Sequence, residues 1–134
     1  MTPESLRFLS KARRCLYNAR AMLGIGLGDD AGRSAYLAGF HAAKAFIFDH
    51  TGKIAKSHNG VKTMFTDLAR RHPKMPPEFL PFLSHAYHLK EIADYETGED
   101  IVPLETAERT IETATRFVNC IAVILETLPP SSPD

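Results

Sequence analysis

The sequence contains no apolar stretch that approaches the about 20 residues a membrane-spanning helix needs. Its first residues, MTPESLRFLSKARR, mix charges throughout and hold no continuous hydrophobic region of the kind found in secretion signals. Cysteine is scarce, and Cys15 and Cys120 form no CxxC pair. We therefore expect a cytoplasmic protein with reduced thiols, no membrane association and no cysteine-bound metal.

Motifs of several enzyme classes are also missing. No Gly-x-Ser-x-Gly turn occurs, and the adjacent Ser57 and His58 are poorly placed to act as nucleophile and base. The stretch GIGLGDD, residues 24–30, follows no strand and lacks the spacing of a dinucleotide- or phosphate-binding loop. His85 and His88 lie three residues apart without a third ligand, so we expect no zinc site and no cofactor.

What the sequence does contain is helical periodicity, without the alternation that indicates strands. We expect the first helix to start at Thr2-Pro3-Glu4, and the second to be capped by Asp29 or Asp30 and to end at Gly52. The third helix should run from about Ser57 to Arg71. The fourth should start at about Pro81 and the fifth at Pro103. The last helix has an apolar position every three or four residues from Leu104 to Leu128, which predicts packing along another helix, within the subunit or across a dimer. We predict one all-α domain, an up-and-down helical bundle of about five helices over residues 1–128, with a disordered tail over 129–134.

Charge is balanced overall but unevenly distributed. Residues 1–72 hold twelve Lys or Arg against five Asp or Glu, and residues 73–134 hold four against eleven. The basic half can meet phosphates, and the acidic half can pair with it within or between subunits. Ordinary solvation of helix surfaces accounts for the same pattern.

Four short motifs follow one another in this helical frame: YLAGFHAA at residues 36–43, KSH at 56–58, ADY at 93–95 and an alanine- and phenylalanine-rich last helix. In this order they make the chain resemble the HEPN family over about residues 5–128. The resemblance implies a helical bundle that forms homodimers. It also implies a gene beside that of a minimal nucleotidyltransferase, in a two-gene toxin–antitoxin-like module.

Some members of that family are metal-independent ribonucleases that use an arginine followed four to six residues later by a histidine. No arginine of this chain has a histidine at that separation. Lys90, four residues before Asp94, occupies the position where this branch of the family usually has arginine. Lysine lacks the planar donor fork of arginine, so we expect little or no catalysis.

The local charges and the resemblance together predict a polar groove that binds nucleotide or RNA. Its candidate residues are His41, Lys56, Ser57, His58, Lys90, Asp94 and Tyr95.

Most of these residues also have a structural interpretation. Ser57 fits a helix cap, and His58 fits a neutral histidine bonded to another helix. Lys90 and Asp94 are spaced to pair on one helix, although Asp94 can instead fix the loop that follows. His41 is typical of a core histidine bonded to a backbone carbonyl. We expect the ring of Tyr95 on the core and its hydroxyl towards the groove, where a partner nucleotidyltransferase could modify it.

The function we predict is a homodimeric binding module of a HEPN and nucleotidyltransferase system, with nucleotide or RNA as ligand. Two alternatives remain. One is a metal-independent ribonuclease in which Lys90, Asp94 and His58 replace the usual pair. The other is a scaffold whose polar groove is purely structural.

Overall fold

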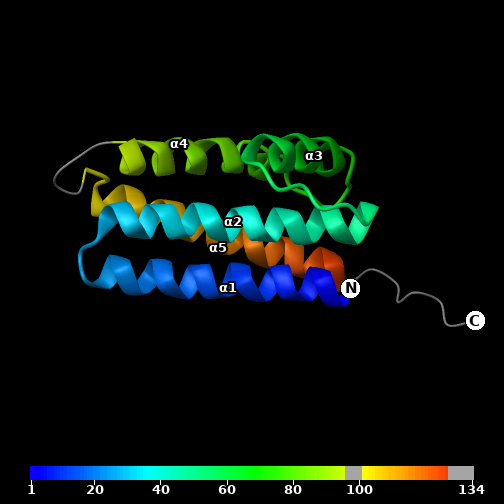
Figure 1. The fold of residues 1–134 in the computed structure, drawn as a ribbon, viewed down its shortest axis with the longest axis horizontal. Coiled ribbons are helices and arrows are strands. Elements are labelled where there is room, and N and C mark those ends of the chain that lie inside the picture. The colour runs from blue at the N-terminus through cyan, green and yellow to red at the C-terminus, as the bar shows by residue number, and fades with distance from the viewer. Residues whose placement is uncertain (96–100, 127–134) are drawn as a thin grey trace, which may run out of the picture.

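The structure is a computed structural model that describes residues 1–95 and 101–126. Every regular element in these residues is helical, which confirms the predicted all-α class (Figure 1). In chain order the elements are α1 (Pro3–Gly24), α2 (Gly28–Thr51), α3 (His58–Arg70), the short 3₁₀ helix η1 (Pro77–Phe79), α4 (Phe82–Tyr95) and α5 (Leu104–Glu126). The predicted tail over 129–134 lies outside the described residues.

Local signals set three of the predicted helix ends. Thr2 and Ser57 each accept, through a side-chain oxygen, a hydrogen bond from an amide in the first turn of α1 and α3, at 3.1 and 3.0 Å. Gly52 ends α2 with a φ of 72°, a conformation that glycine adopts without the steric cost of a Cβ. These ends were predicted because a cap depends on residues within one helical turn.

The predicted cap of α2 is wrong. α2 begins at Gly28, and its N-cap Leu27 makes no side-chain hydrogen bond. Asp29 and Asp30 lie inside the first turn instead, and Asp29 accepts a bond from the amide of Val102 at 2.8 Å. Gly28 packs so closely on the Val102 carbonyl that a Cβ would collide with it. A contact with the distant start of α5 therefore positions this end of α2.

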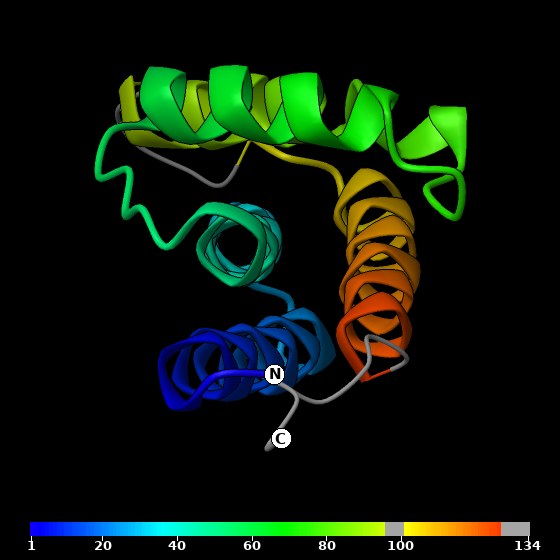
Figure 2. The ribbon, with the colours of Figure 1, turned by 90° about the vertical axis from the view of Figure 1, so that its right-hand side faces the viewer.

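Helix α2 is the centre of the bundle. It contacts α1, α3, α4 and α5, and Figure 2, seen along α2, shows α1 on one side, the layer of α3 and α4 on the opposite side and α5 beside them. Six alanines of α2 are fully buried, at positions 31, 35, 38, 42, 43 and 45. Gly39 lies against the Phe82 ring, so α4 approaches closely at this point.

The apolar stripe of α5 packs inside the subunit. Ile111, Val118, Ile121 and Leu125 are at most 4% exposed, whereas Leu104 at the start of the stripe is 47% exposed. The proline-rich connector before α4 contains η1 and buries Phe79. Among the described residues no helix has both the length and the apolar character to cross a membrane.

Candidate functional site

Three helices bring a polar cluster together, which we call the Asp94 junction: Arg33 from α2, His58 from α3, and Lys90 and Asp94 from α4. The Asp94 carboxylate accepts hydrogen bonds from Arg33 Nε at 2.7 Å and from Lys90 Nζ at 2.8 Å. Arg33 also donates from Nη1 to Asp30 at 2.6 Å. The predicted pairing of Lys90 with Asp94 is therefore present, and a guanidinium from another helix joins it.

The electrostatics of the junction follow from this shared carboxylate. The hydrogen bond from Lys90, and then that from Arg33, lowers the pKa of Asp94 below its usual range. The bonds from Asp94 raise the pKa of Lys90 and of Arg33. The three side chains are 27–33% exposed, so solvent reaches all of them. Both cations and the carboxylate are thus charged at neutral pH and open to a ligand.

His58 is held in place beside this pair. Its Nδ1 shares a 2.9 Å hydrogen bond with the Tyr36 hydroxyl, and its ring stacks on Tyr87 at a centroid distance of 3.6 Å. Burial, followed by the nearby charge of Lys62, lowers the pKa of His58, so the ring is neutral at physiological pH. Its Nε2 has no hydrogen-bond partner among the residues that the structure describes. The histidine fits the interpretation of a neutral ring bonded to another helix.

Ser57 and Tyr95 lie at the edges of the junction. The Ser57 hydroxyl accepts from the Gly60 amide at 3.0 Å, so its oxygen caps α3 as predicted. The expectation that the Tyr95 ring packs on the core is wrong, because Tyr95 is 78% exposed. Ala93 is buried, and two residues further along a helix the side chain has turned about 200° away. A bond from Asp94 to the following loop would lie outside the described residues.

His41 and Lys56 do not join the Asp94 junction. His41 is 9% exposed, and the charges that act on it are Lys11 and Lys44. Burial is the main cause that lowers its pKa to about 4. Its Nδ1 has no hydrogen-bond partner in the described part of the chain, so the predicted bond to a backbone carbonyl is absent. Lys56 is exposed and acts on Lys44 rather than on Lys90.

Sequence analysis missed three residues of this site. Nothing local in the sequence connects Arg33 with Asp94, which lies 61 residues away. Tyr36 begins the YLAGFHAA motif, but nothing in the sequence indicates that its hydroxyl bonds to His58. Tyr87 supplies the ring beneath His58, and Lys90 Nζ lies 5.4 Å from the same ring. Their roles depend on which helix faces meet.

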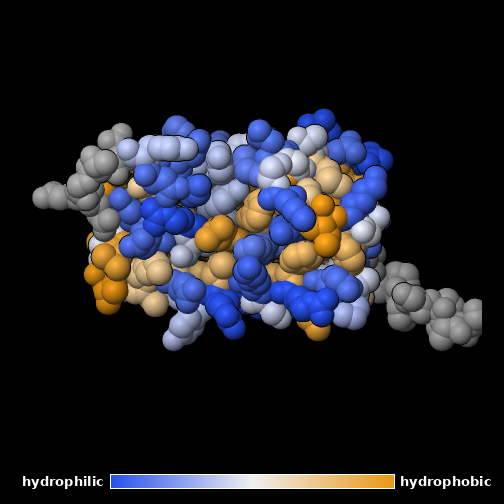
Figure 3. All heavy atoms as spheres, in the orientation of Figure 1, coloured by the Kyte–Doolittle hydropathy of each residue, from blue (hydrophilic) through white to orange (hydrophobic). Residues whose placement is uncertain are grey.

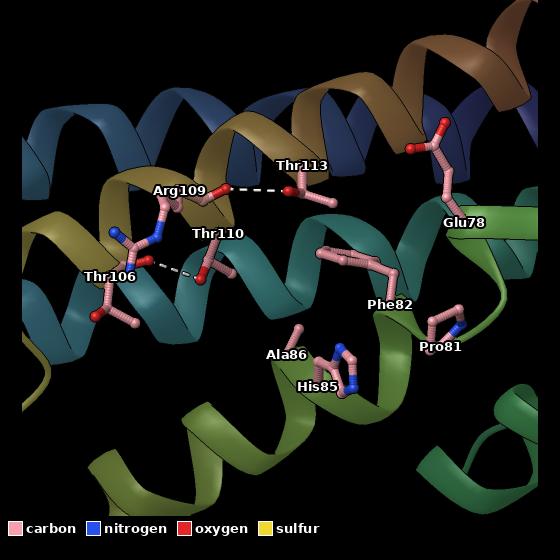
Figure 4. Close-up of a pocket in the computed structure, with 9 residues that line it drawn as sticks. All are labelled: Glu78, Pro81, Phe82, His85, Ala86, Thr106, Arg109, Thr110 and Thr113. Atoms are coloured by element: carbon pink, nitrogen blue, oxygen red, sulfur yellow. Dashed lines mark hydrogen bonds between the residues drawn. The ribbon is translucent and has the colours of Figure 1, made fainter.

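A separate cavity of about 340 Å³ lies between the start of α4 and α5 (Figure 4). The hydroxyls of Thr110 and Thr113 donate to backbone carbonyls of their own helix, at 2.8 and 3.1 Å. Arg109 pairs with Glu105 at 3.3 Å. In Figure 4, His85 stands on α4, across the cavity from Arg109 on α5. The polar side chains Thr110, Thr113 and Arg109 bond within α5, so we assign no site here.

Potential metal ligands do not cluster within the described residues. No three His, Cys, Asp or Glu side chains among them lie close enough together to hold an ion. Cys15 and Cys120 are free thiols, and burial raises the pKa of both. The chemistry that the Asp94 junction offers is therefore that of fixed cations, a carboxylate and a neutral imidazole.

This helical bundle and its motifs define a known class. The family described as the HEPN domain matches residues 5–125, and the chain belongs to that family. A UPF0332 protein of Archaeoglobus fulgidus is 29% identical over 117 residues, which span 83% of this chain and 92% of that protein. The crystal structure of TT1696 from Thermus thermophilus superposes with a TM-score of 0.72 at 18% identity, covering 91% of this chain and 98% of that one. This likeness shows the shared fold.

Proposed function

We propose that this HEPN protein is a binding module for a phosphate-bearing ligand, RNA or a nucleotide, and that the ligand contacts the Asp94 junction. The observation that carries the proposal is the sharing of one carboxylate by an arginine of α2 and a lysine of α4. Arg33 also pairs with Asp30, yet both cations keep N–H donors that bond to no described residue. Lys62 of α3, which has no ion pair among the described residues, adds a third positive charge beside His58.

The free donors of the junction suit a phosphate. A guanidinium has five N–H groups, and Arg33 directs only Nε and Nη1 at carboxylates. Lys90 has three N–H groups and gives one hydrogen bond to Asp94. Arg33 supplies the planar fork that Lys90 lacks, and such a fork binds two phosphate oxygens at once. The site thus combines both cation types despite the lysine at position 90.

The state of His58 favours binding over catalysis. Burial raises the pKa of the Tyr36 hydroxyl, which therefore stays protonated. When this hydroxyl donates to Nδ1, the neutral imidazole carries its own proton on Nε2. Nε2 is then a donor for a phosphate oxygen and cannot accept a proton from a ribose hydroxyl.

A fluorescence-anisotropy titration of a single-stranded RNA tests the binding proposal. Affinity should fall as salt rises, and Lys90→Ala should weaken binding and make the slope shallower by about 0.7, the value for one phosphate contact. Lys90→Arg should bind as well as the wild type or better. Arg109→Ala, which removes an arginine paired on α5, is the matched control. An RNA affinity that changes neither with salt concentration nor with Lys90→Ala would mean that the junction has only a structural role.

Ribonuclease activity is the second candidate function. The observation in its favour is that Nε2 of the neutral His58 has no described partner and lies near the cations of the junction. With the other tautomer, in which Nδ1–H donates to Tyr36, Nε2 could take the proton of a 2′-hydroxyl. RNA incubated with EDTA and the wild type should stay intact under our leading proposal. Cleavage that His58→Ala abolishes would make the protein a metal-independent ribonuclease.

We further propose a homodimer that acts with a partner nucleotidyltransferase in a toxin–antitoxin-like system. Family membership supports this, as does the exposure of Tyr95 at 78% and of Val123 at 57%. The stripe of α5 no longer does, because it is buried within the subunit. Light scattering at micromolar concentration should give twice the monomer mass. After co-expression with an adjacent nucleotidyltransferase gene, mass spectrometry should find Tyr95 modified. A monomeric mass would contradict the proposed homodimer, and an unmodified Tyr95 would contradict the proposed action of the nucleotidyltransferase.

A further inference from the structure

Away from the Asp94 junction, the C-terminal half of α2 carries Lys44. Together with Lys11 of α1 and Lys56 of the segment before α3, it forms what we call the lysine cluster. Lys44 Nζ lies over the ring of Phe8 on α1, and Lys11 follows Phe8 by about one helical turn. Burial, and then the charges of Lys11 and Lys56, lower the pKa of Lys44, so each of these two lysines lies close enough to act on it. None of them forms an ion pair with a described residue. This contrasts with the Asp94 junction, where carboxylates offset the cations.

The carboxylates of the two neighbouring helices are engaged elsewhere. α1 and α2 carry four acids, and each has another partner: Glu4 with Arg7, Asp29 with the Val102 amide, Asp30 with Arg33, and Asp49 with Ser5. The lysine cluster therefore gathers like charges without a described counter-charge. Such an arrangement is unfavourable unless an anion occupies it.

Lys44 is held in position rather than free in solvent. Its Nζ lies 4.9 Å from the centroid of the Phe8 ring and 5.4 Å from that of Phe40, within the range of a cation–π interaction. Lys11 and Lys56, whose charges act on Lys44, are exposed. One cation fixed by ring contacts beside two exposed ones resembles a partly preorganised anion site, because only the exposed side chains must be ordered on binding.

A buried polar atom lies at the same place. His41 is under the influence of Lys11 and Lys44, is 9% exposed and has an Nδ1 without a partner in the described residues. Its low pKa, about 4, means that it adds no positive charge at neutral pH. Incomplete hydrogen bonding of a buried group is typical of sites that a ligand or water completes.

The geometry points to the lysine cluster as a second phosphate site, which binds the backbone of a single-stranded RNA that also reaches the Asp94 junction. Arg33 and Lys44 are eleven residues apart, so they lie on the same face of α2 with about 16 Å between them. The rings of Tyr36 and Phe40 lie between them, with centroids 5.8 Å apart. A stacked strand advances about 3.4 Å per nucleotide, so about five nucleotides span the two sites.

The surface between the two sites is compatible with a strand. Figure 3, which views the α2 face, shows hydrophilic residues along α1 and over α3 and α4, with more hydrophobic residues between them. Cations at both ends of the path, together with apolar surface between hydrophilic margins, suit a single-stranded nucleic acid, in which phosphates meet cations and bases meet apolar surface. A dinucleotide or ATP is too short to reach both ends.

The phosphate site at the lysine cluster does not depend on the proposed function; only the RNA strand that joins it to the Asp94 junction does. The first experiment therefore tests the lysine cluster independently of the junction. Protein labelled with ¹³C-lysine is titrated with inorganic pyrophosphate, and the Cε signals are followed by NMR. We expect saturable shifts at Lys11, Lys44 and Lys56, whatever happens at Lys90. Signals of the three lysines that stay unchanged in folded protein at millimolar pyrophosphate would overturn the lysine cluster as a phosphate site.

The second experiment measures a ten-nucleotide RNA and a dinucleotide with the double variant Lys11→Gln/Lys56→Gln. Both side chains are exposed, so the variant should fold. We expect about tenfold weaker binding of the longer RNA, a salt slope shallower by about 1.4, and unchanged dinucleotide binding. Lys74→Gln/Arg116→Gln removes equal charge beside α5 and is the control.

The outcomes of this binding experiment distinguish the two proposals. A loss no larger than that of the control would overturn the RNA path, whatever the effect of Lys90→Ala. A loss with the double variant but none with Lys90→Ala would uphold the lysine cluster and refute the proposed function at the junction. Pyrophosphate shifts without any RNA binding would assign the cluster to a small phosphate compound and refute the strand.

Discussion

The substitution Asp94→Asn tests whether one carboxylate joins α2 to α4. It removes the charge that Arg33 and Lys90 share at 2.7 and 2.8 Å. Two unit charges 4 Å apart interact by about 1 kcal/mol in water and about 4 kcal/mol near a protein surface. The side chains are 27–33% exposed, so screening reduces each pair to about 1 kcal/mol. We expect a loss of about 1–2 kcal/mol in the free energy of unfolding at pH 7.

The pH dependence gives this prediction its sharpest test. The pKa of Asp94 is lower in the folded protein than its ordinary value of 3.8. A carboxyl group of this kind contributes stability that is fully present above the unfolded pKa and is lost as pH falls through the folded pKa. The difference between wild type and Asp94→Asn should therefore be full at pH 7 and should shrink below pH 4.

Urea unfolding followed by circular dichroism, at pH 7 and at pH 3, measures both quantities. Asp67→Asn is the matched control, because Asp67 pairs with Arg71 at 2.9 Å on the surface of one helix and is 71% exposed. It should cost less than about 0.5 kcal/mol. An Asp94→Asn loss no larger than that of the control, or a loss that stays the same at pH 3, would refute the reasoning.

Three other substitutions test the fold around the site. Ser57→Ala should lower stability by about 1 kcal/mol in urea unfolding and leave RNA affinity nearly intact, because the hydroxyl caps α3; collapse of binding at unchanged stability would instead make it a ligand contact. Gly39→Ala should cost about 1–3 kcal/mol, since its methyl would meet the Phe82 ring, whereas Gly24→Ala, with open space around it, should cost far less in the same assay. The pKa of His41 falls from 6.5 to about 4 on folding, so between these pH values the unfolded chain protonates His41 and the folded protein does not. The free energy of unfolding should therefore decline by up to about 3 kcal/mol as pH drops from 7 to 4. His41→Leu should flatten that decline, and an unaltered pH profile would count against the buried neutral ring.

The helices were predictable because their signals are local. Caps such as Ser57 and ends such as Gly52 act within one turn, and the three-to-four spacing of apolar residues marks each buried face. The start of α2 was not predictable from the same rules. Contact with Val102, more than seventy residues away, decides which residue begins the helix and what Asp29 binds.

The candidate site was predicted only in part, for a related reason. Lys90 and Asp94 are one helical turn apart, so their pairing follows from sequence spacing. Arg33 joins them only because α2 and α4 pack face to face. His41 and Lys56 carry the right chemistry for a phosphate groove, but the bundle places them with Lys11 and Lys44. The order of motifs along a chain does not reveal which neighbouring helix each polar residue meets.

The central claim is that Arg33 supplies the guanidinium of a phosphate site from outside the motif that contains Lys90. The most direct test is the affinity of Arg33→Gln for a ten-nucleotide RNA over a series of salt concentrations. We expect weaker binding and a salt slope shallower by about 0.7, as for one lost phosphate contact, with the RNA still uncleaved. Wild-type affinity and slope in Arg33→Gln, while Lys90→Ala still weakens binding, would contradict it.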